Sequence, residues 1–235
     1  MKRRHLLAGL PFVSLQAQSP ANPPSLYIPQ PHLVEDRQFL HDFMDEFPFV
    51  ELVTATPGVR ITHIPVLLDR EGGSYGRIFG HVSRQNPQSD TFDGAHTGVI
   101  VFRGPHSYIS PTWYAKPDVV PTWNFAVVHA TGRLKRVGDK QALHDLLARL
   151  IHRFEQSPAY DFAKLPRSYK DGLMSGIVGF EMEIERLEGK FKLGQERTAA
   201  DRAGILENLQ SRKKKRSIEE MTGDFYERRK AGEAR

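Results

Sequence analysis

The chain has 235 residues, of which 39% are hydrophobic and 26% are charged, and this mixture supports one large folded domain with appendages. Because cysteine is absent, disulfides, thiolate metal sites, iron–sulfur clusters and cysteine nucleophiles are excluded, and no stretch approaches the ~20 apolar residues of a membrane-spanning helix. The net charge is +5, but residues 2–4 carry +3 and residues 211–235 carry +4, so the remainder carries −2 and does not favour a nucleic-acid-binding face.

The first 25 residues resemble an export signal. Arg3 and Arg4 precede a short apolar run from Leu6 to Leu15, a pattern typical of the twin-arginine type. The alternative is a disordered N-terminal arm. We expect the folded domain to span residues 26–210 and a charged tail to span residues 211–235, where the basic cluster Arg212–Arg216 is interpreted as a solvated surface.

Periodicity predicts a mainly β domain with peripheral helices. Apolar residues at helical spacing favour helices over 35–47, after an N-cap at Asp139, and over 196–210. Alternating or β-branched runs bounded by turn residues predict strands over 49–55, 59–68, 75–82, 98–103, 123–137 and 177–187. Pro65 predicts a sheet edge or a bulge, because proline has no backbone donor, and Gly132 predicts a bend. An antiparallel barrel with peripheral helices fits this order best.

Several common catalytic motifs are absent. The sequence contains no P-loop, no G-x-G-x-x-G after a strand, no H-E-x-x-H and no G-x-S-x-G. The ten histidines lack the short spacings that place two imidazoles on one metal. A hydrolase or metalloenzyme is therefore disfavoured, and no side chain stands out as a general acid or base.

The segment 62–129 has an unusual composition. It contains both tryptophans and three of the seven tyrosines, among Gly-Pro, Asn-Pro and Ser-Pro steps. Aromatic rings beside small donors and a few cations suit a flat, anionic ligand. The alternative interpretation is that these rings plug the barrel and an oligomer interface.

Several blocks make the chain similar to a known family. They are T-H-I-P at 62–65, G-H-V-S-R-Q-N-P-Q at 80–88, F-R-G-P-H-S-Y-I-S-P-T-W-Y at 102–114, V-P-T-W-N-F-A-V-V-H at 120–129, G-I-V-G-F-E-M-E-I at 176–184 and K-L-G-Q-E-R at 192–197. Over roughly residues 26–210 the chain resembles the PaiB-like family of FMN-binding negative transcriptional regulators. The resemblance implies the FMN-binding split β-barrel of pyridoxamine phosphate oxidases and flavin reductases, and a homodimer with flavin at the subunit boundary.

The resemblance also implies a set of cofactor-binding residues. Arg84, helped by the Ser83 hydroxyl, is expected to hold the FMN phosphate, because a cation and a short donor suit an anion. Ile64 and Pro65 are expected to present backbone to the isoalloxazine ring, while Trp113, Trp123 and Asn124 are expected from the partner subunit. The full set is Thr62, His63, Ile64, Pro65, His81, Ser83, Arg84, Asn86, Tyr108, Ser110, Trp113, Trp123, Asn124, Gln195 and Arg197. The alternatives are a buried, hydrogen-bonded strand histidine at His63 or His129, and a surface cation at Arg84.

Three functions remain open from the sequence. The first is an FMN-binding regulator in the cytoplasm, as the family description implies. The second is a flavin-dependent oxidoreductase or flavin reductase, either cytoplasmic or exported, in which the flavin does the electron chemistry. The third is a haem-binding module on the same barrel, with His63, His81, His106 and His129 as available ligands.

Overall fold

The computed structural model describes residues 24–116, 119–211 and 222. The expected export signal, apart from its last two residues, and nearly all of the charged tail therefore lie outside the described residues. Within the described part, no helix is long and apolar enough to cross a membrane.

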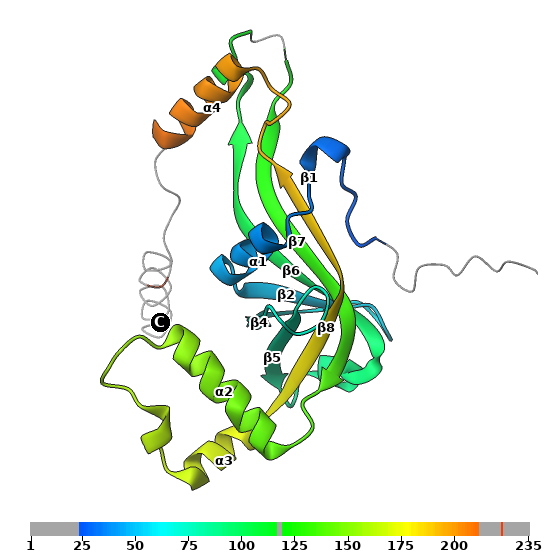
Figure 1. Ribbon diagram of the computed structural model, residues 1–235, viewed down its shortest axis with the longest axis vertical. Helices are drawn as coiled ribbons and strands as arrows, with labels where there is room; N and C mark the ends of the chain where they lie inside the picture. The colour runs from blue at the N-terminus through cyan, green and yellow to red at the C-terminus, as the bar shows by residue number, and fades with distance from the viewer. Residues whose placement is uncertain (1–23, 117–118, 212–221, 223–235) are drawn as a thin grey trace, which may run out of the picture. The chain divides into compact units, whose positions relative to one another are not determined.

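Eight strands form one sheet (Figure 1), as a mainly β fold predicts. Their order is β3-β2-β6-β7-β8-β5-β4, and β1 pairs with β8 outside this path. The pairings of β2 with β3 and β6, of β5 with β4 and β8, and of β1 with β8 are all antiparallel. The strands are β1 Leu33–Val34, β2 Phe49–Thr54, β3 Arg60–Pro65, β4 Leu67–Asp69, β5 Arg77–Ser83, β6 Asp93–Ile109, β7 Thr122–Arg136 and β8 Ile177–Lys192.

The described part of the chain contains four α-helices: α1 Arg37–Glu46, α2 Lys140–Phe154, α3 Arg167–Ser175 and α4 Ala199–Ser211. The predicted N-cap of α2 is confirmed, since the Asp139 carboxylate accepts a 2.8 Å hydrogen bond from the Ala142 amide. Asp36 caps α1 in the same way through the Phe39 amide. The short helix α3 has no counterpart among the predicted elements.

The chain forms two compact units, and each is described here by itself. Within the described residues, the first consists of 24–27, Glu35–Phe102 and Val128–Glu188, and the second of Ile28–Val34, 103–116, 119–127, 189–211 and 222. In the first unit, alternate residues of the strands are buried, and Leu146 and Leu150 of α2 pack with Leu67 of β4 and Phe79 of β5. The second unit has a small core of Ile109, Tyr114 and Ile205.

Two strand predictions need correction. The segment 59–68 is two strands rather than one, because β3 ends at Pro65 and β4 begins at Leu67. Pro65 lies on β3 at the end of the strand order, which confirms its predicted edge position. Strand β6 is much longer than the predicted segment 98–103, because it begins at Asp93 and continues to Ile109. These changes leave the fold class intact: a mainly β split barrel with peripheral helices.

Candidate functional site

A buried glutamine organises the loop that follows β5. Gln88 lies in the short 3-10 helix η2, Pro87–Thr91, and is 0% exposed. Its amide nitrogen donates to the Leu52 carbonyl at 3.0 Å and to the Thr54 hydroxyl at 3.2 Å, both on β2. Its amide oxygen accepts a 2.5 Å hydrogen bond from Thr62 Oγ1 on β3. Gln88 therefore ties the loop to two strands.

Two of the predicted site residues meet at this glutamine. Asn86 Nδ2 donates to Thr62 Oγ1 at 2.8 Å, and Asn86 Oδ1 accepts from the backbone N–H of Gln88 at 2.9 Å. These bonds hold the loop in place.

The sequence did not predict the role of Gln88, since a single glutamine after Asn-Pro resembles any exposed loop residue until its burial is known.

The predicted phosphate ligand lies close by in sequence, at the end of β5. Arg84 is exposed, and its guanidinium donates through Nε to the Ser175 carbonyl at 2.5 Å and through Nη2 to the Ile177 carbonyl at 3.0 Å. These carbonyls end α3 and begin β8, so Arg84 also has a structural role. Among the described residues its Nη1 has no hydrogen-bond partner, which leaves donors for an anion. The neighbouring Ser83 is exposed, and its hydroxyl accepts from the Gln85 amide at 3.3 Å.

The surroundings of Arg84 fit a phosphate group. A cavity of about 380 Å³ beside it is also lined by Arg136, Lys140, Asp139 and Asp171. Three cations therefore face two carboxylates, and Asp171 is itself paired with Lys140 at 2.8 Å. Asp139 is engaged as the N-cap of α2. The donor set is cationic on balance, as the phosphate of FMN requires.

The residues T-H-I-P of β3 alternate between the two faces of the sheet. Ile64 is buried, whereas His63 and Pro65 are exposed. The His63 ring is stacked beside that of Phe49 with 6.5 Å between centroids, and its Nδ1 lies 4.0 Å from Glu51. His63 is thus an exposed residue and not a buried strand histidine. Phe49 of β2 and His63 of β3 therefore form an exposed surface of two stacked rings.

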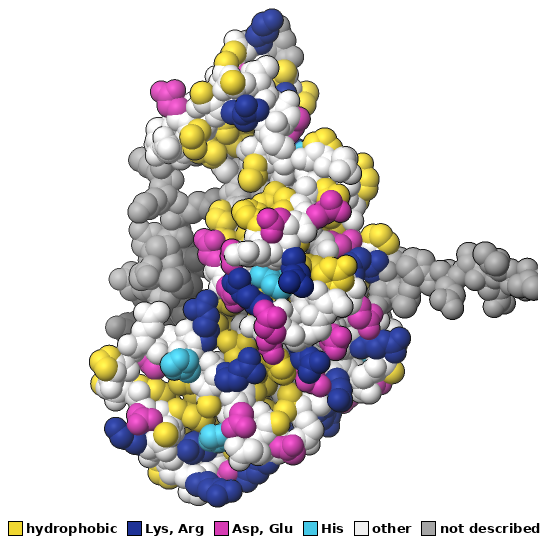
Figure 2. Space-filling model, in the orientation of Figure 1, with side chains coloured by type: hydrophobic (Ala, Val, Ile, Leu, Met, Phe, Trp, Pro, Cys, Tyr) yellow, Lys and Arg dark blue, Asp and Glu magenta, His cyan; other side chains and the backbone are white. Residues whose placement is uncertain are grey.

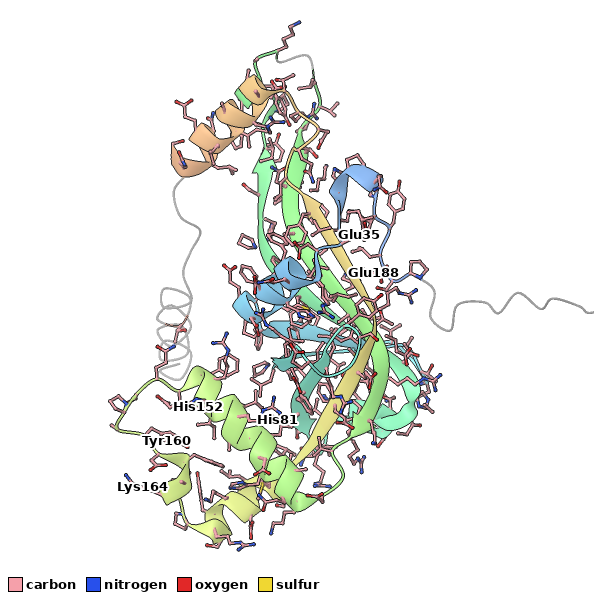
Figure 3. The ribbon with its side chains drawn as sticks, viewed as in Figure 1. Glu35, His81, His152, Tyr160, Lys164 and Glu188 are labelled. Atoms are coloured by element: carbon pink, nitrogen blue, oxygen red, sulfur yellow. The ribbon has the colours of Figure 1, made fainter. Side chains whose placement is uncertain are left out.

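Two half-buried histidines of the first unit lie on other strands. Burial lowers the pKa of His81 on β5, and its Nδ1 has no hydrogen-bond partner in the described part of the chain. Burial also lowers the pKa of His129 on β7, although Glu188 and Glu51 oppose this effect. His129 Nδ1 lies 3.0 Å from Ser25 Oγ, which donates to Glu188 at 2.7 Å. Figure 3 labels Glu188 on β8. His129 therefore matches the alternative of a hydrogen-bonded strand histidine.

The second unit contains the aromatic members of the predicted site. Trp123 is 49% exposed, and its ring lies 5.4 Å from that of His106 and 6.2 Å from that of Tyr108. Trp113 instead packs against the small core of this unit. Ser110 caps the 3-10 helix η3, Pro111–Trp113, by accepting from the Thr112 amide.

Gln195 and Arg197 of the late motif are engaged within the second unit. The Gln195 side chain accepts from the Leu193 amide at 2.8 Å and donates to the Phe191 carbonyl at 2.5 Å. The Arg197 guanidinium lies 4.8 Å above the Tyr114 ring. Both residues therefore hold the turn between β8 and α4.

Asn124 faces a cavity of its own unit. This cavity of about 470 Å³ is lined mainly by apolar residues, among them Leu193, Ile205 and Leu206. Asn124 is only 7% exposed. The predicted residues thus form one polar group on β3, β5 and the following loop, and a second group in the other unit. Across residues 24–116, 119–211 and 222, no group of three or more acidic, histidine or cysteine side chains is placed to hold a metal.

Comparison with known proteins identifies the family. The family model described as "Putative FMN-binding domain" matches residues 26–186. The protease synthase and sporulation protein PAI 2 of Bacillus subtilis is 32% identical over 190 residues, which cover 79% of this chain and 90% of that protein. A protein of Emericella nidulans is 29% identical over 228 residues, with 79% and 91% covered.

Solved structures show the same fold at low identity. The flavocytochrome Anf3 of Azotobacter vinelandii has a TM-score of 0.54 at 15% identity and covers 68% of this chain and 69% of its own. The conserved hypothetical protein Rv2991 of Mycobacterium tuberculosis has a TM-score of 0.52 at 13% identity, with 82% and 99% covered. By its sequence match and its fold, the chain belongs to this FMN-binding domain family and is a homologue of PAI 2.

Proposed function

We propose that the protein binds FMN on the first unit, with the phosphate at Arg84 and Ser83 and the ring beside the T-H-I-P segment of β3. The family match over residues 26–186 carries this proposal. The cationic cavity beside Arg84 supports it, because it offers donors that a phosphate needs. Gln88 and Asn86 act as positioning residues that hold Thr62 and the loop. Bound FMN supplies electron transfer, and the protein supplies position and hydrogen bonds.

We also propose that the protein is a homodimer. Phe49 is 65% exposed and Ile61 is 56% exposed, and both lie on the same face of β2 and β3 as His63. A second copy that covers this face removes apolar surface from water. Trp113 and Trp123 of that copy would then be available to complete the flavin site. Light scattering on the full chain tests the proposal, and a monomer mass contradicts it.

An FMN-responsive regulator is the function that the resemblance to the PaiB-like family favours. A flavin-dependent oxidoreductase is the second candidate, and the charge distribution favours it: the chain outside its two basic ends carries −2. Turnover separates the two. Steady oxidation of a reduced nicotinamide by the FMN-loaded protein supports the oxidoreductase, and FMN binding without turnover supports the regulator.

A pair of ligands tests the phosphate assignment. FMN and riboflavin differ only in the phosphate, so Arg84→Ala should weaken FMN binding by roughly 10–100-fold, the loss of one or two charge-assisted hydrogen bonds, and leave riboflavin nearly unchanged. Arg37→Ala is the matched control, since Arg37 also donates to a carbonyl, that of Ser74, and is exposed. Equal losses for the two flavins in Arg84→Ala, measured by quenching of flavin fluorescence, contradict the assignment.

A further inference from the structure

The apolar cavity of the second unit has the size of a small-molecule site. Its volume is about 470 Å³, within the range of ligand pockets. Helix α4 contributes Ile205, Leu206 and Leu209, and Leu193 follows the end of β8. Figure 2 shows hydrophobic side chains gathered along this helix. The walls therefore favour an apolar ligand body.

Asn124 is the polar group that this cavity leaves unused. Its side chain is 7% exposed, and it has no hydrogen-bond partner among the residues that the structure describes. Asn124 is the third residue of β7, Thr122–Arg136, and it lines the cavity. Its donor and acceptor are therefore available to a ligand inside the cavity.

The other polar groups limit the size and charge of that ligand. Arg202, at the cavity, donates through Nη1 to the Arg197 carbonyl at 2.7 Å and so is partly committed to the backbone. His106 lines the cavity and packs beside Trp123, which extends the aromatic surface. Ser107 also lines the cavity, but most of the lining is apolar, and a ribityl chain carries several hydroxyls that leucine and isoleucine side chains do not bind. A compact ring with one amide group fits these surroundings better than a whole flavin.

We propose that this cavity binds a small, uncharged aromatic carboxamide. Its amide pairs with the Asn124 carboxamide, which matches one donor and one acceptor, and its ring packs against Leu193, Ile205 and Leu206. The family resemblance predicts Asn124 as a flavin-binding residue. The cavity instead favours Asn124 as the group that binds this carboxamide. This inference goes beyond FMN binding and does not depend on it.

Benzamide is a suitable probe, with toluene as the apolar reference. Saturation-transfer NMR and calorimetry on the full chain should detect both. Asn124→Leu keeps the volume and removes the amide, so it should weaken benzamide about tenfold or more while toluene binding is retained. Asn208→Leu is the matched control, because Asn208 lies on α4 and its side chain donates to the Gly204 carbonyl of the same helix.

Three results would overturn the proposal. The first is no binding of benzamide to the wild-type chain at millimolar concentration. The second is an equal affinity for benzamide in wild type and Asn124→Leu, with toluene binding showing that the cavity is intact. The third is competitive displacement of benzamide by FMN, which would return the cavity to the flavin site. If Arg84→Ala loses FMN binding and binds benzamide as the wild type does, the two sites are independent, so either proposal can fail without the other.

Discussion

Replacing Gln88 with alanine should destabilise the first unit more than any exposed loop substitution. The Gln88 side chain is 0% exposed and bonds to Leu52, Thr54 and Thr62 at 3.0, 3.2 and 2.5 Å. Each buried neutral hydrogen bond contributes about 0.5–1.5 kcal/mol, and a stranded partner costs more, so the three bonds together predict a loss of about 2–4 kcal/mol in the free energy of unfolding. Thr62 loses its bond to the Gln88 side chain, whereas Asn86 keeps its bonds to the Gln88 backbone amide and to Thr62.

Urea unfolding followed by far-UV circular dichroism measures this loss, because both tryptophans of the chain lie in the second unit. Gln85→Ala is the matched control, because Gln85 is exposed in the same loop and should change the free energy by less than about 0.5 kcal/mol. The Gln88 variant should also bind FMN more weakly, since the loop that carries Asn86 loses the Gln88 side-chain bonds to β2 and β3. A loss below about 1 kcal/mol in Gln88→Ala would refute the role of this glutamine as the link between the loop and the two strands.

Two further perturbations test the packing and the buried histidines. A Cβ at Gly132 would lie 2.1 Å from the Glu183 carbonyl oxygen, so Gly132→Ala should cost about 3 kcal/mol in urea unfolding, whereas Gly58→Ala, with open space around it, should not. Burial lowers the pKa of His81 and His129, so the folded chain binds their protons more weakly than the unfolded chain. Stability should therefore be full above the ordinary histidine pKa of about 6.5 and fall below it. Thermal unfolding between pH about 8 and about 5.5 checks this, and His81→Leu should flatten the dependence; an unchanged slope would contradict it.

Local patterns were enough to predict most elements of the fold. The Asp139 cap, the edge position of Pro65 and the strand from Phe49 follow from chemistry within a few residues. The length of β6 does not, because Asp93–Gly98 lacks the strong apolar alternation of the rest and becomes a strand through its neighbours. Gly132 is explained by a backbone approach from Glu183, about fifty residues later in the chain, which no local pattern contains.

The candidate site was predictable as a group and less so in its members. Thr62 and Asn86 do meet, yet Gln88, the residue that joins them, is distinguished by burial alone. The Arg84 guanidinium donates to the Ser175 carbonyl and keeps other donors free for a ligand. The residue type alone does not predict that one side chain has both roles. Gln195 and Arg197 hold a turn and a ring within their own unit. Hydrogen bonding between distant segments decides these roles.

The charged side chains of β5, β7 and β8 bear on the proposal that the protein is a regulator. Arg77 pairs with Glu181 at 3.4 Å and Glu183 at 3.1 Å, and Lys135 pairs with Glu181 at 3.4 Å. Arg77 and Lys135 therefore face carboxylates, which reduces the attraction that these two cations offer to a phosphate backbone. Figure 2 likewise shows both signs of charge interspersed on the face in view. For the proposed regulator, these ion pairs favour action through the flavin or a protein partner over contact between a phosphate backbone and Arg77 or Lys135.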